Sequence, residues 1–218
     1  MVVTTPLNHH LMLPETTELA PGATVKDWKV FANAQPEAAS EDTWKDMIKK
    51  FYQGRLLNRY FDPIQKLQQG PSTGEGFAIV AIQCSLIEFL EGCVQGVNYK
   101  YVPRGQPLGP YEYSESMGIF RSFLSTRDPF KRDFTPALAE DFYRKVRCGV
   151  LHEARTYGTW LVHDGHISGR CIEPATPILY RDNFQKAIES FATTYVADVP
   201  VSPGLRAAFV RKFEHLCQ

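Results

Sequence analysis

The segment from Phe77 to Leu90 is apolar on nearly every face and has no charged side chain before Glu88. A helix that is hydrophobic all round is stable only when it is buried, because each of its faces would expose apolar surface to water. The sequence therefore predicts a central helix that other helices enclose. Glu88 is the exceptional residue in this segment.

Helical patterns on both sides of this segment predict the elements that enclose it. Capping residues and residues of the first helical turn mark where these helices begin. The predicted starts are Ser40, Asp62-Pro63, Ser114, Thr135-Pro136, Asp182 and Pro203. Together with the central helix they predict an all-α fold, a helical bundle that ends in two C-terminal helices.

Three other regions are predicted not to be helical. Residues 1–39 contain four prolines and little periodicity, which predicts an extended N-terminal arm ahead of a single helical domain over residues 40–218. Asp164-Gly165 has the composition of a type I′ turn and predicts a small β-hairpin near residues 159–172. The Gly- and Pro-rich connection from Gly96 to Pro110 predicts a lid or a binding loop.

Composition restricts the classes of function. The formal net charge is zero, which argues against nonspecific coating of DNA or anionic lipid, so any nucleic acid must meet a local basic patch. The five cysteines are odd in number and scattered, which argues against a disulfide framework or a zinc ribbon. We find no signal peptide and no run of about 20 apolar residues, so we expect a cytoplasmic protein. We also expect that it uses no metal or cofactor.

The run from Val146 to Glu153, in the helix that begins at Thr135-Pro136, carries the clearest chemical pattern. His152 could accept the proton of a ribose 2′-hydroxyl or protonate a leaving 5′-oxygen. Arg147 could bind the phosphate that links these two oxygens' nucleotides. At about 100° per residue the two side chains lie about 140° apart, with Leu151 between them on a polar face. An apolar residue there indicates a covering partner, for which a second protomer is the obvious candidate.

A structural interpretation of the same residues stays open. Arg147 could form an ion pair with Glu88 or Glu153, while His152 packs near the end of the helix. Cys148 and His152 lie at i and i+4, so a thiolate-imidazole pair is a further alternative.

The motif resembles the Arg-x4-6-His signature of the HEPN superfamily, here Arg147-Cys148-Gly149-Val150-Leu151-His152. The resemblance implies a helical domain that dimerises through the motif helix, so that two motifs face a shared cleft. It implies a metal-independent endoribonuclease that cleaves single-stranded RNA to 2′,3′-cyclic phosphate and 5′-hydroxyl ends, in a toxin, antiviral or RNA-processing setting. Arg147 would bind the phosphate, His152 would be the general acid/base, and Glu88 is our candidate for an acidic residue from another helix. Members without nuclease activity imply the alternative of a nucleotide-, RNA- or protein-binding module.

Weaker patterns concern metals and RNA. His163, His166 and Cys171 surround the predicted hairpin, but their spacing favours solvated polar side chains over metal ligands. Tyr99, Tyr101 and Tyr111 in the long loop could stack unpaired bases. Basic residues precede the motif helix and lie on the first long helix, where they could supply the local positive field that RNA needs. They are Arg121, Arg127, Lys131 and Arg132 in the first group, and Lys49, Lys50, Arg55 and Arg59 in the second.

Overall fold

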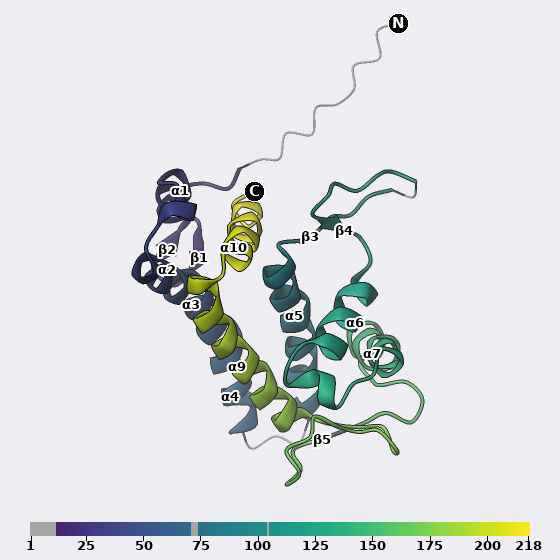
Figure 1. Ribbon diagram of the computed structural model, residues 1–218. Helices are drawn as coiled ribbons and strands as arrows, with labels where there is room; N and C mark the ends of the chain where they lie inside the picture. Colours follow the sequence, from purple (N-terminus) through teal and green to yellow (C-terminus); the bar gives the residue numbers. More distant parts are fainter. Residues whose placement is uncertain (1–11, 71–73, 104) are drawn as a thin grey trace, which may run out of the picture.

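The fold is built around one helix, α5 (Glu75–Gln95), which runs through the middle of the molecule (Figure 1). This is a computed structural model, and it describes residues 12–70, 74–103 and 105–218. The side chains of Leu86, Ile87 and Leu90 are inaccessible to solvent. The prediction of a central buried helix within a mostly helical fold is confirmed.

The other α-helices differ widely in length. They are α1 (Val25–Asn33), α2 (Glu41–Ile48), α3 (Gly54–Leu56), α4 (Asp62–Gln68), α6 (Ser116–Thr126), α7 (Pro136–Phe142), α8 (Cys148–Glu153), α9 (Arg181–Asp198) and α10 (Pro203–His215). Single π-helical turns connect several of them, over Lys49–Gln53, Leu57–Phe61 and Tyr143–Arg147. We therefore call the continuous run over residues 41–68 the long helix, and the run over residues 136–153 the motif helix.

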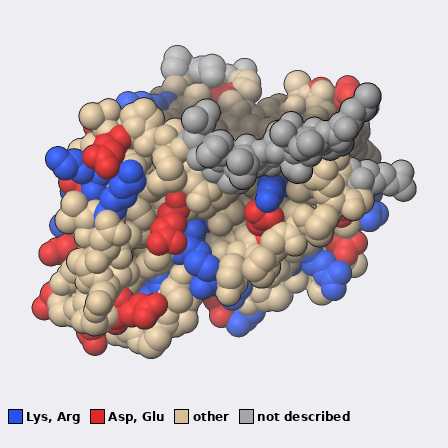
Figure 2. All heavy atoms as spheres, turned by 90° about the horizontal axis from the view of Figure 1, so that it is seen from above, with Lys and Arg blue, Asp and Glu red and all other residues tan. Residues whose placement is uncertain are grey.

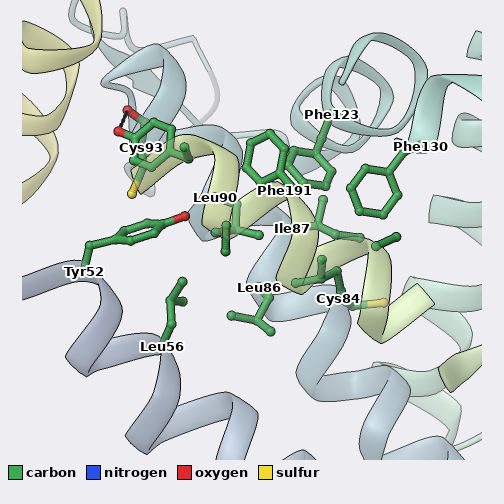
Figure 3. Packing of buried hydrophobic residues seen from close by; sticks show 14 of the residues in the cluster. Tyr52, Leu56, Cys84, Leu86, Ile87, Leu90, Cys93, Phe123, Phe130 and Phe191 are labelled. Carbon is green, nitrogen blue, oxygen red and sulfur yellow. Dashed lines mark hydrogen bonds between the residues drawn. The ribbon is translucent and has the colours of Figure 1, made fainter. Parts of the chain in front are cut away.

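These helices enclose α5 from several sides. α6 packs along it on one side, and α9 and α10 pack along it on the other, with α4 and α8 also in contact. Figure 3 shows Tyr52 and Leu56 reaching from the long helix toward α5. On the opposite side Phe123 meets Phe130 and Phe191, with ring centroids 4.9 and 4.8 Å apart. One hydrophobic cluster thus joins helices that are distant in the sequence.

α5 is the single helix in the described part of the chain whose length and composition would allow it to cross a membrane. Its apolar side chains are instead used inside the protein, against the helices that surround it. This is the behaviour of the core helix of a soluble protein.

The N-terminal segment from residue 12 to residue 39 is folded, so the prediction of an extended arm is wrong there. An antiparallel ribbon of β1 (Glu18–Ala20) and β2 (Ala23–Thr24) leads into α1. Thr24 and Asp27 form a reciprocal capping box, in which the Thr24 Oγ1 accepts from the Asp27 backbone N–H and the Asp27 carboxylate accepts from the Thr24 backbone N–H. Residues 1–11 of the predicted arm lie outside the described residues.

The physical reason for this difference lies in the spacing of apolar residues between the prolines. Val25, Trp28 and Phe31 follow one another at three-residue intervals and form one buried face of α1. The Trp28 ring packs against Phe209 and Phe213 of α10, with centroids 5.9 and 5.2 Å apart. The burial of three large side chains stabilises the helix, and the prolines lie outside it.

The predicted restart of a helix at Asp62-Pro63 is also wrong, because the long helix continues through it. Proline lacks the N–H that an α-helix interior requires. The π-helical turn over Leu57–Phe61 lies just ahead of Pro63, so the helix changes its hydrogen-bond pattern where the proline interrupts it.

The predicted hairpin around Asp164-Gly165 does not form. A three-stranded sheet has the order β5 (Leu161–His163), β7 (Ile178–Tyr180), β6 (Ile172–Glu173), in which β5 pairs with β7 in parallel and β6 pairs with β7 antiparallel. Gly165 does not adopt the positive φ that a type I′ turn requires. The Asp164 carbonyl instead accepts the Asp182 N–H at 2.8 Å, which fixes β5 at the start of α9. A second pair of short strands, β3 (Asn98–Tyr99) and β4 (Glu112–Tyr113), closes the long loop after α5.

Candidate functional site

The motif helix places Arg147 at the end of a π-helical turn and His152 in the last turn of α8. Thr135 caps this helix as predicted, since its Oγ1 accepts the Leu138 N–H at 3.2 Å, and Pro136 occupies the first turn. The helix ends at Ala154, which has a left-handed backbone with φ of 53°. π-helical turns are frequent at functional sites, and this one ends on Arg147, the first residue of the motif.

Arg147 contacts Glu88 of α5, a contact that both the HEPN resemblance and the structural interpretation predicted. The Arg147 Nη2 atom lies 3.4 Å from the Glu88 Oε2 atom, and each side chain is 19% exposed. The guanidinium also lies over the Tyr143 ring, with Cζ 5.4 Å from the ring centroid. The buried Nε atom of Arg147 has no hydrogen-bond partner among the described residues. The guanidinium therefore keeps unused donor capacity.

Glu88 is held in place by two hydroxyl groups. Tyr113 Oη donates to its Oε1 atom at 3.3 Å, and Ser116 Oγ donates to the same oxygen. Burial, followed by the negative charge of Glu88, raises the pKa of Tyr113, so this phenol remains a donor at neutral pH. These bonds orient the carboxylate that faces Arg147.

The Glu88–Arg147 pair lies in an open pocket of about 680 Å³. We call it the Arg147 pocket. It is lined by Glu88, Tyr99, Ser114, Glu115, Ser116, Met117, Tyr143, Arg144 and Arg147. Arg144 adds a second, mostly exposed guanidinium, and Tyr99 adds a half-exposed aromatic ring. The pocket thus combines two guanidinium groups, two carboxylates (Glu88 and Glu115), hydroxyl groups and an aromatic surface. Guanidinium groups can bind a phosphate, and an aromatic ring can stack on an attached base.

His152 is not part of this pocket within one chain. Its side chain is exposed, and it is not among the residues that line the Arg147 pocket. The structure therefore brings Glu88 and Arg147 together but does not bring His152 to them.

Leu151 and Gly149, which lie between Arg147 and His152, have different surroundings. Leu151 is 46% exposed. Gly149 lies against the backbone of Arg155 and Thr156 in the turn that follows α8, where a side chain would clash. The chain folds back over its own helix there, as the hydrogen bond from the Tyr157 N–H to the Lys145 carbonyl (2.8 Å) shows.

The residues considered as metal ligands pack against other side chains or are buried. Cys171 is buried, and burial raises its pKa to about 12. His166 stacks on Tyr180 with ring centroids 4.9 Å apart, and His163 meets the same ring edge-on at 6.4 Å. Among residues 12–70, 74–103 and 105–218, no cluster of three His, Cys, Asp or Glu side chains could hold a metal ion.

The two predicted groups of basic residues do not border the Arg147 pocket. Arg127 pairs with Glu91, and Arg55 and Arg59 donate to the carbonyls of Leu19 and Glu18. Figure 2 shows acidic and basic side chains interspersed across one face of the molecule. The cations of the pocket lining are Arg144 and Arg147 instead, and the lining also contains Glu88 and Glu115.

Three residues that contact the Glu88–Arg147 pair escaped prediction. Tyr143 lies four positions before Arg147, a spacing at which helical side chains meet, so this contact could have been found from the sequence. Tyr113 and Ser116 come from β4 and α6 and reach Glu88 only through the tertiary fold.

No protein-family model, no curated protein and no solved structure matches this chain. The interpretation of the pocket therefore depends on its own geometry.

Proposed function

We propose that this protein is a cytoplasmic, metal-independent endoribonuclease of the HEPN type that cleaves single-stranded RNA. The observation that carries the proposal is the contact of Glu88 on α5 with Arg147 of the Arg-x4-His motif, inside an open pocket. The motif and an acidic residue from another helix were expected to meet, and their side chains lie 3.4 Å apart. The helical surroundings also fit a HEPN-like bundle.

Arg147 is the phosphate-binding residue in this proposal. Its guanidinium makes one long contact with Glu88 and lines the open pocket, where a guanidinium can hold the scissile phosphate by a bidentate bond. Glu88 orients it, and Arg144 adds positive charge at the entrance. The half-exposed ring of Tyr99 offers a surface on which an unpaired base can stack.

His152 acts as the general acid/base. It accepts the proton of the 2′-hydroxyl as the 2′-oxygen attacks phosphorus, and it returns this proton to the 5′-oxygen as the bond from phosphorus to that oxygen breaks. The products are a 2′,3′-cyclic phosphate and a 5′-hydroxyl. No electrons are transferred, and neither step requires a metal ion.

A second protomer completes the site, because His152 lies outside the Arg147 pocket of its own chain. Leu151 lies next to His152 and is exposed, so a two-fold contact through the motif helices would cover it and bring two motifs to one cleft. The protein is therefore proposed to act as a homodimer in a toxin, antiviral or RNA-processing setting.

The test measures cleavage of a fluorescent single-stranded RNA in EDTA by the wild type and by His152→Ala. We expect cleavage to survive EDTA, to yield cyclic phosphate ends, and to fall about 10²–10⁴-fold in the variant, the range for loss of a general acid/base. His163→Ala is the matched control, since this exposed histidine lies outside the pocket. Abolition of cleavage by EDTA, or full activity of His152→Ala, would contradict the mechanism.

The same preparations test the dimer by sedimentation velocity. Leu151→Glu should produce monomers and reduce cleavage, whereas Leu161→Glu should do neither, although Leu161 is just as exposed (48%). A wild type that sediments as a monomer, or a dimer indifferent to Leu151→Glu, would rule out this interface.

A non-catalytic module that binds a nucleotide or RNA through Arg147 is the second candidate. The position of His152 outside the pocket favours it, because binding requires only the groups that line the pocket. Its signature is RNA binding by the wild type that is lost in Arg147→Ala, with no RNA cleavage by either protein.

A further inference from the structure

A second pocket, separate from the Arg147 pocket, lies between the long helix and α9. It has a volume of about 670 Å³, within the range of small-molecule sites, and shares no lining residue with the first pocket. We call it the α9 groove. It is lined by Tyr52, Gln53, Leu56, Leu57, Phe61, Asp62, Gln65, Gln68, Asp182, Gln185, Lys186, Glu189, Ala192 and Thr193.

One half of the α9 groove is apolar. Tyr52 and Leu56 are buried and reach from the long helix into the core (Figure 3), and Ala192 lies opposite them on α9. Leu57 is 51% exposed, so an apolar side chain of the lining meets solvent. This half would gain from contact with a hydrocarbon chain.

The other half carries negative charge. The Gln68 amide donates to the Asp182 carboxylate at 2.7 Å, so the end of the long helix meets the start of α9 and the two helices run in opposite directions. The charged residues of this lining are three acids, Asp62, Asp182 and Glu189, and one cation, Lys186. Gln68 and Arg181 contact Asp182, and Gln185 donates to one oxygen of Glu189 at 2.9 Å. Asp62 and Glu189 are the two exposed carboxylates of the lining, so both are accessible to a cationic ligand.

The shape of the groove is long and narrow. Its lining on α9 extends from Asp182 to Thr193, which corresponds to about 16 Å along a helix. Two π-helical turns, over Lys49–Gln53 and Leu57–Phe61, both contribute lining residues. Such turns are uncommon and recur at functional sites, and here both belong to the wall of the same groove.

We propose that the α9 groove is a binding site for a linear amphipathic amine, a hydrocarbon chain that ends in an ammonium group. The chain lies along Leu56, Leu57 and Ala192, and the ammonium group lies between Asp62 and Glu189. A neutral molecule would leave these carboxylates without a counter-charge, and a carboxylic acid would be repelled by them. This site functions independently of the Arg147 pocket and of RNA cleavage.

The test uses three ligands with the same eight-carbon chain and different head groups: octylamine, 1-octanol and octanoate. Isothermal titration calorimetry and shifts in the NMR signals of groove residues report binding to the full chain. We expect octylamine to bind at least about tenfold more tightly than octanol, as expected for two ion pairs at a partly exposed site, and octanoate not to bind.

Two double variants separate charge in the groove from charge in general. Asp62→Asn with Glu189→Gln should reduce octylamine affinity to that of octanol. Glu41→Gln with Asp46→Asn removes the same charge from an exposed part of the long helix and should leave affinity unchanged. RNA cleavage should be unaffected in both.

Three results would overturn the proposal. They are equal binding of the three ligands, unchanged octylamine affinity in the groove variant, and binding of a basic amphipathic peptide by a groove that takes no octylamine. If cleavage is absent while octylamine binds as expected, the proposed function fails and the groove proposal stands.

Discussion

Two glutamates of α5, one helical turn apart, face two arginines in different ways. Glu91 is fully buried, and both of its oxygens accept from Arg127 at 2.9 Å in a bidentate pair. Ser122 donates to the same carboxylate at 2.6 Å. Glu88 makes one contact of 3.4 Å with Arg147, and the Arg147 pocket opens beside it.

The Glu91–Arg127 pair is therefore structural, whereas the Glu88–Arg147 pair is placed where a ligand can reach it. A buried carboxylate is stable when its lone pairs are satisfied, and Glu91 meets this condition within the protein. The Glu88–Arg147 pair leaves an arginine Nε atom without a partner in the described residues. A phosphate could therefore bind Arg147 without the loss of a saturated ion pair.

The largest expected effect is on RNA cleavage. Arg147→Ala should reduce it about 10²–10³-fold, the range for loss of one group that stabilises the transition state. Arg127→Ala should leave cleavage per folded molecule within about twofold, because Arg127 does not line the pocket. Initial rates, corrected for the folded fraction by circular dichroism, test both. Equal losses in the two variants would remove the distinction between the pairs.

The second effect is on stability. Glu91→Gln should lower the free energy of unfolding by about 3 kcal/mol, because a buried ion pair loses one partner and an amide N–H₂ group then faces the Arg127 donors. Glu88→Gln should lower it by less than about 1 kcal/mol, since the pair is long and partly exposed. Urea unfolding at pH 7 measures both. A larger loss for Glu88→Gln would identify the Glu88 pair as the structural one.

The smallest expected effect concerns Tyr113, whose hydroxyl donates to Glu88. Tyr113→Phe should lower the free energy of unfolding at pH 7 by about 1 kcal/mol, through loss of one hydrogen bond. Burial raises the pKa of Tyr113 above its ordinary value of 10.0. Below pH 10 both the folded and unfolded states keep the proton, so this contribution to stability is fully present.

Above pH 10 the unfolded state releases the Tyr113 proton first, and stability falls as the pH rises. The wild type should therefore lose stability more steeply than Tyr113→Phe in this range, as urea unfolding between pH 9 and pH 11 would show. Tyr101→Phe is the control, since this side chain is 79% exposed. Identical alkaline slopes for the wild type and Tyr113→Phe would mean that Tyr113 is not held in its protonated form.

Local sequence patterns predicted the elements well where burial and capping agreed. Ser40 and Thr135 cap helices as expected, and the apolar run that contains Glu88 is the central helix. Prediction failed where a nonlocal contact decided the outcome. Asp164-Gly165 lies beside the start of α9 because β5 pairs with β7, and no property of the dipeptide specifies that partner.

The features of the candidate site also fall into those set by local sequence and those set by nonlocal contacts. By itself the sequence determined that Arg147 and His152 share a helix and point in different directions, because helical geometry fixes the angle between them. Only the tertiary structure decided that Arg147 meets Glu88, that Tyr113 and Ser116 hold this carboxylate, and that His152 stays outside the pocket. Helix periodicity is a local property of the chain, whereas these contacts depend on how α5, α6 and the motif helix pack around one core.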